Sequence, residues 1–157
     1  MAEQQFSGVD GAVKLVLIVD DRPDDCLILE KMLRRLGVSN NIVKLSSGEE
    51  AIDYLDGKGE FQERYSHPFP SVLFLDLKMP GKNGFDVLEW LQDHPVRGKC
   101  VVFVVSELHS FAQINRAYRL GATSYFSKPL SETEIRECLR NRSELWEFDV
   151  QKFSQAM

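Results

Sequence analysis

The sequence has few cysteines and histidines, and their spacing excludes the common metal and disulfide frameworks. Only three cysteines occur in the 157 residues, and Cys26, Cys100 and Cys138 form no CxxC pair. We therefore expect reduced thiols, with neither a disulfide scaffold nor a structural zinc site. The three histidines likewise lack the spacing of a metal-binding motif.

The sequence also lacks long apolar runs and any excess of positive charge. Its apolar segments are much shorter than the roughly 20 residues of a membrane-spanning helix. The first residues, MAEQQFSGVDGAVK, are polar and include an acid, unlike a secretory signal peptide. A net charge of −5 argues against a nucleic-acid-binding surface. We therefore expect a cytoplasmic protein with no membrane and no nucleic-acid partner.

Short apolar segments alternate with helical patterns along the chain. The segments that predict strands are 14–19, 42–45, 72–75, 100–105 and 124–126. They are continuous apolar runs, which is typical of parallel strands that are covered on both faces. Each is followed by a stretch with helical spacing, and Ser47, Ser110 and Ser131 begin three of these stretches as capping residues. We therefore predict an α/β fold, a doubly wound five-stranded parallel sheet of flavodoxin-like order 2-1-3-4-5 with helices on both faces.

The same patterns predict one domain with short tails. We expect an N-terminal tail at 1–13, a domain at 14–148 and a C-terminal tail at 149–157, which leaves no room for an output domain. The connection at 57–71, GKGEFQERYSHPFPS, is unusually long for a compact domain. We predict that its GEFQERY stretch extends the preceding helix after a glycine interruption.

Polar residues follow the predicted strands at the edge of the sheet where ligands bind in this architecture. Asp20 and Asp21 follow the first strand, Asp76 the third, Ser106 the fourth and Lys128 the fifth. Three adjacent carboxylates repel one another unless a cation holds them, and ligands that are all oxygen favour Mg²⁺. Such a site suits a phosphoryl group, with Asp76 as the nucleophile that accepts it.

These motifs resemble those of bacterial two-component response-regulator receiver domains, over roughly Lys14 to Trp146. The resemblance is carried by Asp20-Asp21, LDLKMPGKNG around Asp76, VVS ending at Ser106, and SYFSKP with Lys128-Pro129. It implies that Asp76 is the phosphoacceptor and a Mg²⁺ ligand. It further implies that Asp21 binds Mg²⁺ directly, Asp20 through water, and Lys78 through its backbone carbonyl.

The resemblance also implies how phosphorylation is sensed. Ser106 and Lys128 are expected to contact the phosphoryl oxygens, and Tyr125 to change rotamer as Ser106 moves. The Lys128–Pro129 peptide bond is expected to be cis. The surface that changes is then the helix after Ser110, the 124–126 strand and the last helix. Leu108 cannot orient an attacking water as a polar residue would, so we expect slow hydrolysis of the phosphorylated state.

The partner implied by the resemblance is a sensor histidine kinase or a phosphotransfer protein. The long 57–71 connection and the aromatic tail with Trp146 and Phe148 resemble single-domain receivers that partner phytochrome-type histidine kinases. We expect a homodimer through the helix after Ser110, the 124–126 strand, the last helix and the C-terminal segment. The alternative is that Trp146 and Phe148 fold back over the core of their own domain.

Three other functions remain open at this point. A phosphatase of the haloacid-dehalogenase type also uses an aspartate after a parallel strand, but its second acid would stand where Lys78 is. A flavodoxin-like cofactor binder needs a phosphate loop, and DDRPDD would repel a phosphate. A receiver that only binds partners is the third. We predict that the protein is not an enzyme but a phosphoacceptor that assists its own phosphorylation and dephosphorylation.

Overall fold

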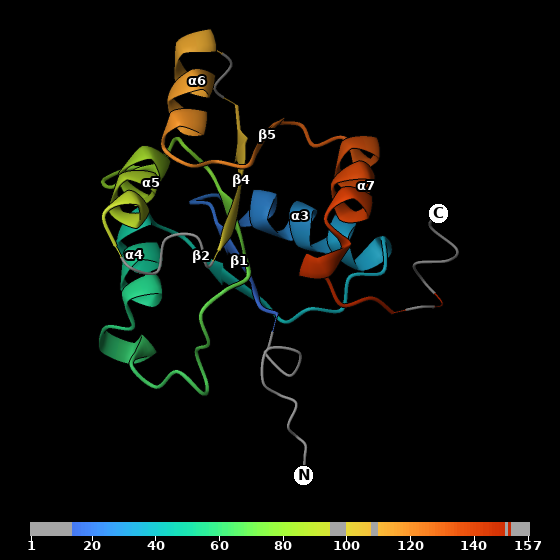
Figure 1. Ribbon diagram of the computed structural model, residues 1–157, viewed down its shortest axis with the longest axis horizontal. Helices are drawn as coiled ribbons and strands as arrows, with labels where there is room; N and C mark the ends of the chain where they lie inside the picture. The colour runs from blue at the N-terminus through green and yellow to red at the C-terminus, as the bar shows by residue number, and fades with distance from the viewer. Residues whose placement is uncertain (1–13, 95–99, 108–109, 150, 152–157) are drawn as a thin grey trace.

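The computed structural model describes residues 14–94, 100–107, 110–149 and 151, and these form one parallel sheet with helices on both faces (Figure 1). All strand pairs are parallel, and the order is β2-β1-β3-β4-β5. The predicted α/β fold and strand order are therefore confirmed. The elements are β1 (Val16–Val19), α3 (Pro23–Arg35), β2 (Ile42–Leu45), α4 (Gly48–Asp56), the 3₁₀ turn η1 (Gly59–Phe61), β3 (Val72–Leu75), α5 (Gly84–Gln92), β4 (Val101–Ser106), α6 (Phe111–Arg119), β5 (Ser124–Ser127), α7 (Glu132–Asn141) and the 3₁₀ turn η2 (Ser143–Leu145).

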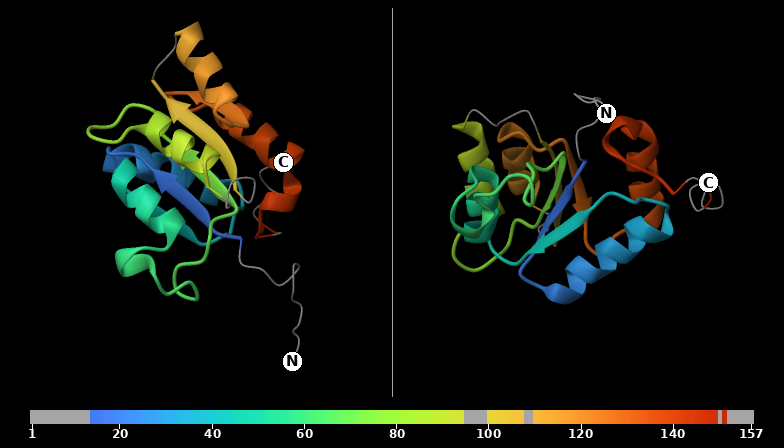
Figure 2. Two further views of the ribbon diagram at one scale, coloured as in Figure 1. Left: turned by 60° about the vertical axis from the view of Figure 1, so that its left-hand side comes forward. Right: turned by 90° about the horizontal axis from the view of Figure 1, so that it is seen from below.

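Two hydrophobic layers hold the helices to the sheet. Helices α3 and α7 cover one face, and α4, α5 and α6 cover the other (Figures 1 and 2). Successive residues of each central strand enter opposite layers, so Val72 and Phe74 face α3 and α7, whereas Leu73 and Leu75 face the other helices. Both faces of the central strands are thus buried, which explains their continuous apolar sequence. Over the described ranges, none of the helices is long and apolar enough to cross a membrane.

The long connection after α4 is not a continuation of that helix, so this prediction was wrong. Only the single 3₁₀ turn η1 forms within it. Gly57 ends α4 in the left-handed conformation, with φ of 68°. The Arg64 guanidinium then donates hydrogen bonds to the carbonyls of Tyr54 and Leu55, both at 2.7 Å. Because these carbonyls already have a partner, the last turn of α4 is satisfied without further helix.

The segment after α7 folds back onto its own domain. Trp146 is only 4% exposed and packs against the rings of Phe74 and Phe103, with centroid distances of 6.3 and 6.4 Å. Phe148 is half-buried and forms an antiparallel bridge with Val38. The fold-back alternative is therefore confirmed for Trp146, and its expected place on an exposed aromatic face was wrong.

A buried asparagine joins this segment to the start of β1. The Asn40 side chain is fully buried, and its Nδ2 donates to the carbonyls of Lys14 (2.6 Å) and Leu145 (3.1 Å). Its Oδ1 accepts a hydrogen bond from the backbone N–H of Glu147 (2.6 Å). One side chain thus fixes both ends of the described domain, and its bond to the Leu145 carbonyl is buried, where water does not compete with it.

Candidate functional site

Asp76 lies directly after β3, at the carboxyl edge of the sheet. Its backbone N–H donates to the carbonyl of Val19 (3.0 Å), so the residue continues the ladder between β1 and β3. The following loop is anchored because Leu77 and Met79 are buried in the core. Lys78 lies between them with an exposed side chain, and its backbone N–H donates to Asp76 Oδ1 (3.2 Å). The alternation of apolar and polar residues in this loop fixes the direction of the Asp76 carboxylate.

Helix α5 begins very close to the backbone of Asp76. A Cβ atom on Gly84 would lie 2.3 Å from the carbonyl oxygen of Asp76, a distance that no side chain allows. Glycine is therefore required where the first turn of α5 meets the site. Asn83 caps this helix through a reciprocal pair of hydrogen bonds with Asp86. The NGFD stretch thus begins the helix and leaves room for the loop that carries Asp76.

The carboxylates of Asp20, Asp21 and Asp76 form one cluster, with an oxygen of each within 4.8 Å of the others. Asp20 and Asp76 are buried, whereas Asp21 is half-buried. Burial and the neighbouring charge of Asp20 together raise the pKa of the Asp76 carboxyl to about 6, against the opposing effect of Lys128. The cluster therefore fits a cation, which would relieve this repulsion.

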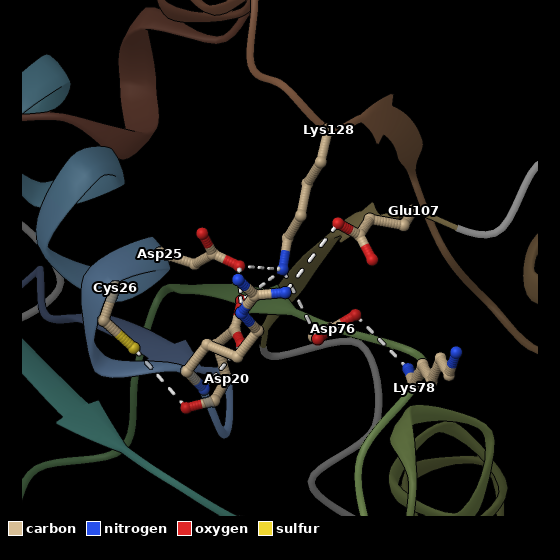
Figure 3. Close-up of polar contacts among 8 residues, drawn as sticks. Asp20, Asp25, Cys26, Asp76, Lys78, Glu107 and Lys128 are labelled. Carbon is tan, nitrogen blue, oxygen red and sulfur yellow. Dashed lines mark hydrogen bonds and ion pairs between the residues drawn. The ribbon is translucent and has the colours of Figure 1, made fainter.

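Lys128 reaches into the cluster from the end of β5 (Figure 3). Its Nζ donates to Asp20 Oδ2 at 2.7 Å, to Asp25 Oδ2 at 2.8 Å and to Asp76 Oδ2 at 3.4 Å. Burial lowers the pKa of the Lys128 ammonium, but the hydrogen bonds to Asp20 and Asp25 outweigh it and raise the pKa overall. The Lys128–Pro129 peptide bond is cis. The ammonium is thus held in its charged form beside the Asp76 carboxylate.

Sequence reasoning missed three charged residues of this site. Asp25 binds Lys128 from the first turn of α3, a position where an acid is in any case favourable because of the helix dipole. Arg22 lies between two acids, with Nε 3.5 Å from Asp25 Oδ2 and Nη1 3.9 Å from Glu107 Oε2. The only sequence signal was position, since Arg22 and Asp25 follow Asp20-Asp21 and Glu107 follows Ser106.

Ser106 is the last residue of β4, and Tyr125 lies on the neighbouring strand β5, where it pairs with Val104. Ser106 is fully buried, and its carbonyl accepts a hydrogen bond from the backbone N–H of Lys128 (3.0 Å). Burial raises the pKa of Tyr125, while its interaction with Ser106 acts in the opposite direction. The tyrosine hydroxyl therefore points inward, toward the serine. Leu108, the residue predicted to slow hydrolysis, lies outside the described residues.

A pocket of about 420 Å³ opens above the cluster. Its lining residues are Asp21, Arg22, Asp76, Lys78, Met79, Pro80, Glu107 and Lys128. The donors around the cluster are carboxylate oxygens, the ligand type that Mg²⁺ prefers and that soft metals do not. The residues present therefore fit a Mg²⁺ ion, with Lys128 placed to neutralise further negative charge in the pocket.

Comparisons with known proteins agree with this geometry. The family model of the response regulator receiver domain matches residues 16–140. The response regulator Rcp1 of Synechocystis sp. is 23% identical over 133 residues, which cover 85% of this chain and 88% of Rcp1.

Solved structures give the same result. A response regulator in red light signaling of R. palustris is 31% identical, with a TM-score of 0.72, covering 85% of this chain and 93% of that one. The phosphorylated cyanobacterial phytochrome response regulator RcpA is 26% identical, with a TM-score of 0.71 and coverages of 86% and 94%. The chain therefore belongs to the response regulator receiver domain family, whose general mechanism is phosphorylation of an aspartate by a histidine kinase.

Proposed function

We propose that Asp76 is the phosphoacceptor of this receiver domain. The observation that carries the proposal is the Lys128 ammonium, held between the buried carboxylates of Asp20 and Asp76 at the floor of an open pocket. A carboxylate oxygen of Asp76 attacks the phosphorus of a phosphohistidine. The new O–P bond forms as the P–N bond breaks, and its electron pair returns to the donor imidazole.

Residues of this chain stabilise the charge that develops in the transfer. Lys128 donates to the phosphoryl oxygens, and the Ser106 hydroxyl turns toward them as they arrive. Asp21 and Asp76 would hold Mg²⁺ directly, with Asp20 acting through water and Lys78 through its backbone carbonyl. Bound Mg²⁺ neutralises charge on the phosphoryl oxygens. Because the Tyr125 hydroxyl lies beside Ser106, movement of the serine alters the packing of this ring and so the surface of α6, β5 and α7.

Incubation with acetyl phosphate and Mg²⁺ tests the proposal. We expect the intact mass to increase by one phosphoryl group, and hydroxylamine to remove it, because acyl phosphates are cleaved by this nucleophile. Peptide mapping should place the group in the segment that contains Asp76. A stable label on a serine, threonine or histidine would contradict the proposal.

The metal site gives a separate prediction. Mutation of a residue that only orients a metal ligand typically lowers metal affinity or activity roughly 10- to 100-fold. We expect Asp21→Asn to reduce the labelling rate by more than this, because Asp21 is itself a proposed ligand. Mg²⁺ should raise the thermal unfolding midpoint of the wild type, because it binds the folded chain, and should fail to do so in Asp21→Asn. Asp24→Asn is the matched control, since Asp24 is exposed and carries the same charge. Full labelling in EDTA would show that no divalent metal is needed.

The partner and setting follow from the similar proteins. The red-light regulator of R. palustris and the cyanobacterial phytochrome regulator RcpA both align over most of this chain. We therefore propose a phytochrome-type histidine kinase as the donor and a cytoplasmic location. We further propose that the receiver domain spans 14–148, because Asn40 binds the Lys14 carbonyl and Val38 pairs with Phe148. Phosphotransfer from candidate kinases of the source organism tests this pairing.

A homodimer through α6, β5, α7 and the C-terminal segment is the proposed output. Phe111 and Tyr118 are 78% and 46% exposed on α6, whereas that helix fully buries only Ala117 among its described residues. Large exposed aromatic side chains favour interfaces. Sedimentation with and without beryllofluoride should show a dimer that phosphoryl mimicry strengthens, and Phe111→Ala/Tyr118→Ala should weaken it. A wild type that is monomeric in both states would exclude the dimer.

A further inference from the structure

We propose that Asp25 is a positioning residue that draws Lys128 away from the phosphoacceptor and competes with the phosphoryl group for its ammonium. The inference rests on the proposed function, because it concerns the same transfer to Asp76. It assigns to Asp25 a restraining part in the reaction: the unphosphorylated state is stabilised by a contact that phosphorylation must break.

The distances show the competition directly. An ammonium has three N–H donors, and those of Lys128 are directed to Asp20 (2.7 Å), Asp25 (2.8 Å) and Asp76 (3.4 Å). The two short contacts are with Asp20, which follows β1, and with Asp25 on α3, and the contact with the acceptor is the longest. Figure 3 shows the ammonium between these carboxylates, with Asp25 approaching from α3. The Lys128 ammonium is therefore bound more closely by Asp20 and Asp25 than by the acceptor Asp76.

The local backbone holds Asp25 in this place. Pro23 stands in the first turn of α3, and the backbone N–H of Asp25 donates to the Arg22 carbonyl (3.0 Å). The Asp25 side chain is 20% exposed and that of Lys128 is 11% exposed, so water screens their attraction only in part. A pair of this kind is strong enough to set the position of a flexible lysine.

When Asp76 carries a phosphoryl group, Lys128 must supply a donor to it. Asp20 is the less replaceable partner, because its other oxygen already accepts the Arg22 backbone N–H (3.0 Å) and its carboxylate belongs to the metal cluster. Asp25 has a second cation, since Arg22 Nε lies 3.5 Å from the same Oδ2 that binds Lys128. Asp25 can therefore release the lysine without leaving its own charge unpaired.

The test compares Asp25→Asn with Asp24→Asn. Both changes remove one acid from the first turn of α3, but the exposed Asp24 does not approach the site. We expect Asp25→Asn to be labelled by acetyl phosphate about fivefold faster than wild type at saturating Mg²⁺, the scale of one partly exposed charge interaction. Without metal or phosphodonor, the Lys128 ¹⁵Nζ ammonium signal should exchange its protons several-fold faster. Asp24→Asn should match wild type in both measurements.

Each outcome decides the question. Faster labelling together with faster ammonium exchange supports the inference. Slower labelling of Asp25→Asn would show that Asp25 prepares Lys128 for transfer, and an unchanged rate would show that Asp25 has no part in it. Either result overturns the inference. The proposed function still stands in both cases, provided that the wild type is labelled. Unchanged ammonium exchange overturns it as well. An unlabelled wild type overturns the proposed function and, with it, the inference.

Discussion

Asp76→Asn is expected to abolish phosphoryl labelling of the protein. The amide keeps the shape of the carboxylate but lacks the nucleophilic oxygen that forms the bond to phosphorus. Within the cluster, Lys128 binds Asp20 more closely than Asp76, at 2.7 Å against 3.4 Å, and Asp21 is half-buried whereas Asp76 is buried. Intact mass after incubation with acetyl phosphate and Mg²⁺ measures the effect, with labelling falling to background.

The matched control is Asp53→Asn, an exposed acid on α4. It should be labelled like the wild type. The fold of Asp76→Asn should be at least as stable as that of the wild type in metal-free buffer, because burial and the Asp20 charge both disfavour the ionised Asp76 carboxyl, whose pKa is about 6. Loss of labelling is then loss of the acceptor and not unfolding. Labelling of Asp76→Asn at the wild-type level would assign the chemistry to another residue.

The fold could be predicted because the strands are buried on both faces. VLFL at β3 and VVFVV at β4 have no polar face, which is a property of central parallel strands. The capping residues Ser47, Ser110 and Ser131 were also correct, since each accepts a hydrogen bond from the backbone of the helix that it begins. These signals are local, so they can be recognised without knowing how the elements pack.

Much of the candidate site could be located for a related reason. Parallel strands bring their carboxyl ends to one edge, so the residues at the ends of β1, β3, β4 and β5 meet there regardless of the lengths of the loops.

The pairing of Asp25 with Lys128 could not be predicted in this way. It joins residues 103 positions apart, and depends on the angle of α3 to the sheet and on one lysine rotamer. Neither the angle nor the rotamer has a sequence signal.

The end of α4 before the 57–71 connection and the position of the aromatic tail could not be predicted for the same physical reason. Arg64 caps α4 from nine residues away through its contact with the Leu55 carbonyl. The tail is fixed by Asn40, whose contact with Glu147 spans 107 positions. The amino-acid composition alone does not show whether an aromatic residue after the last helix packs on the core of its own domain or on a partner chain. The long-range polar contacts decide between these outcomes.

Trp146→Ala is expected to destabilise the domain severely. Trp146 is 4% exposed and stacks on Phe103 at an interplanar angle of 14°, with Phe74 beside it. Truncation of a large buried aromatic side chain leaves a cavity and typically costs about 3–5 kcal/mol of unfolding free energy. For an ordinary domain that is a large fraction of the total stability. Urea unfolding monitored by circular dichroism measures the change as a lower midpoint.

Two further variants make the result specific to packing. Among the described residues no hydrogen-bond partner reaches the buried Nε1 of Trp146, so Trp146→Phe removes an unpaired donor along with part of the ring and should cost much less than alanine. Trp90 is half-buried on α5 and stacks on His94, so Trp90→Ala should cost less than Trp146→Ala. If Trp146→Ala left the unfolding midpoint unchanged and instead dissociated a dimer, Trp146 would belong to an interface between two chains. The expected loss of stability, with no dependence on protein concentration, would instead place it in the core beneath β3 and β4, the two strands whose carboxyl ends carry Asp76 and Ser106.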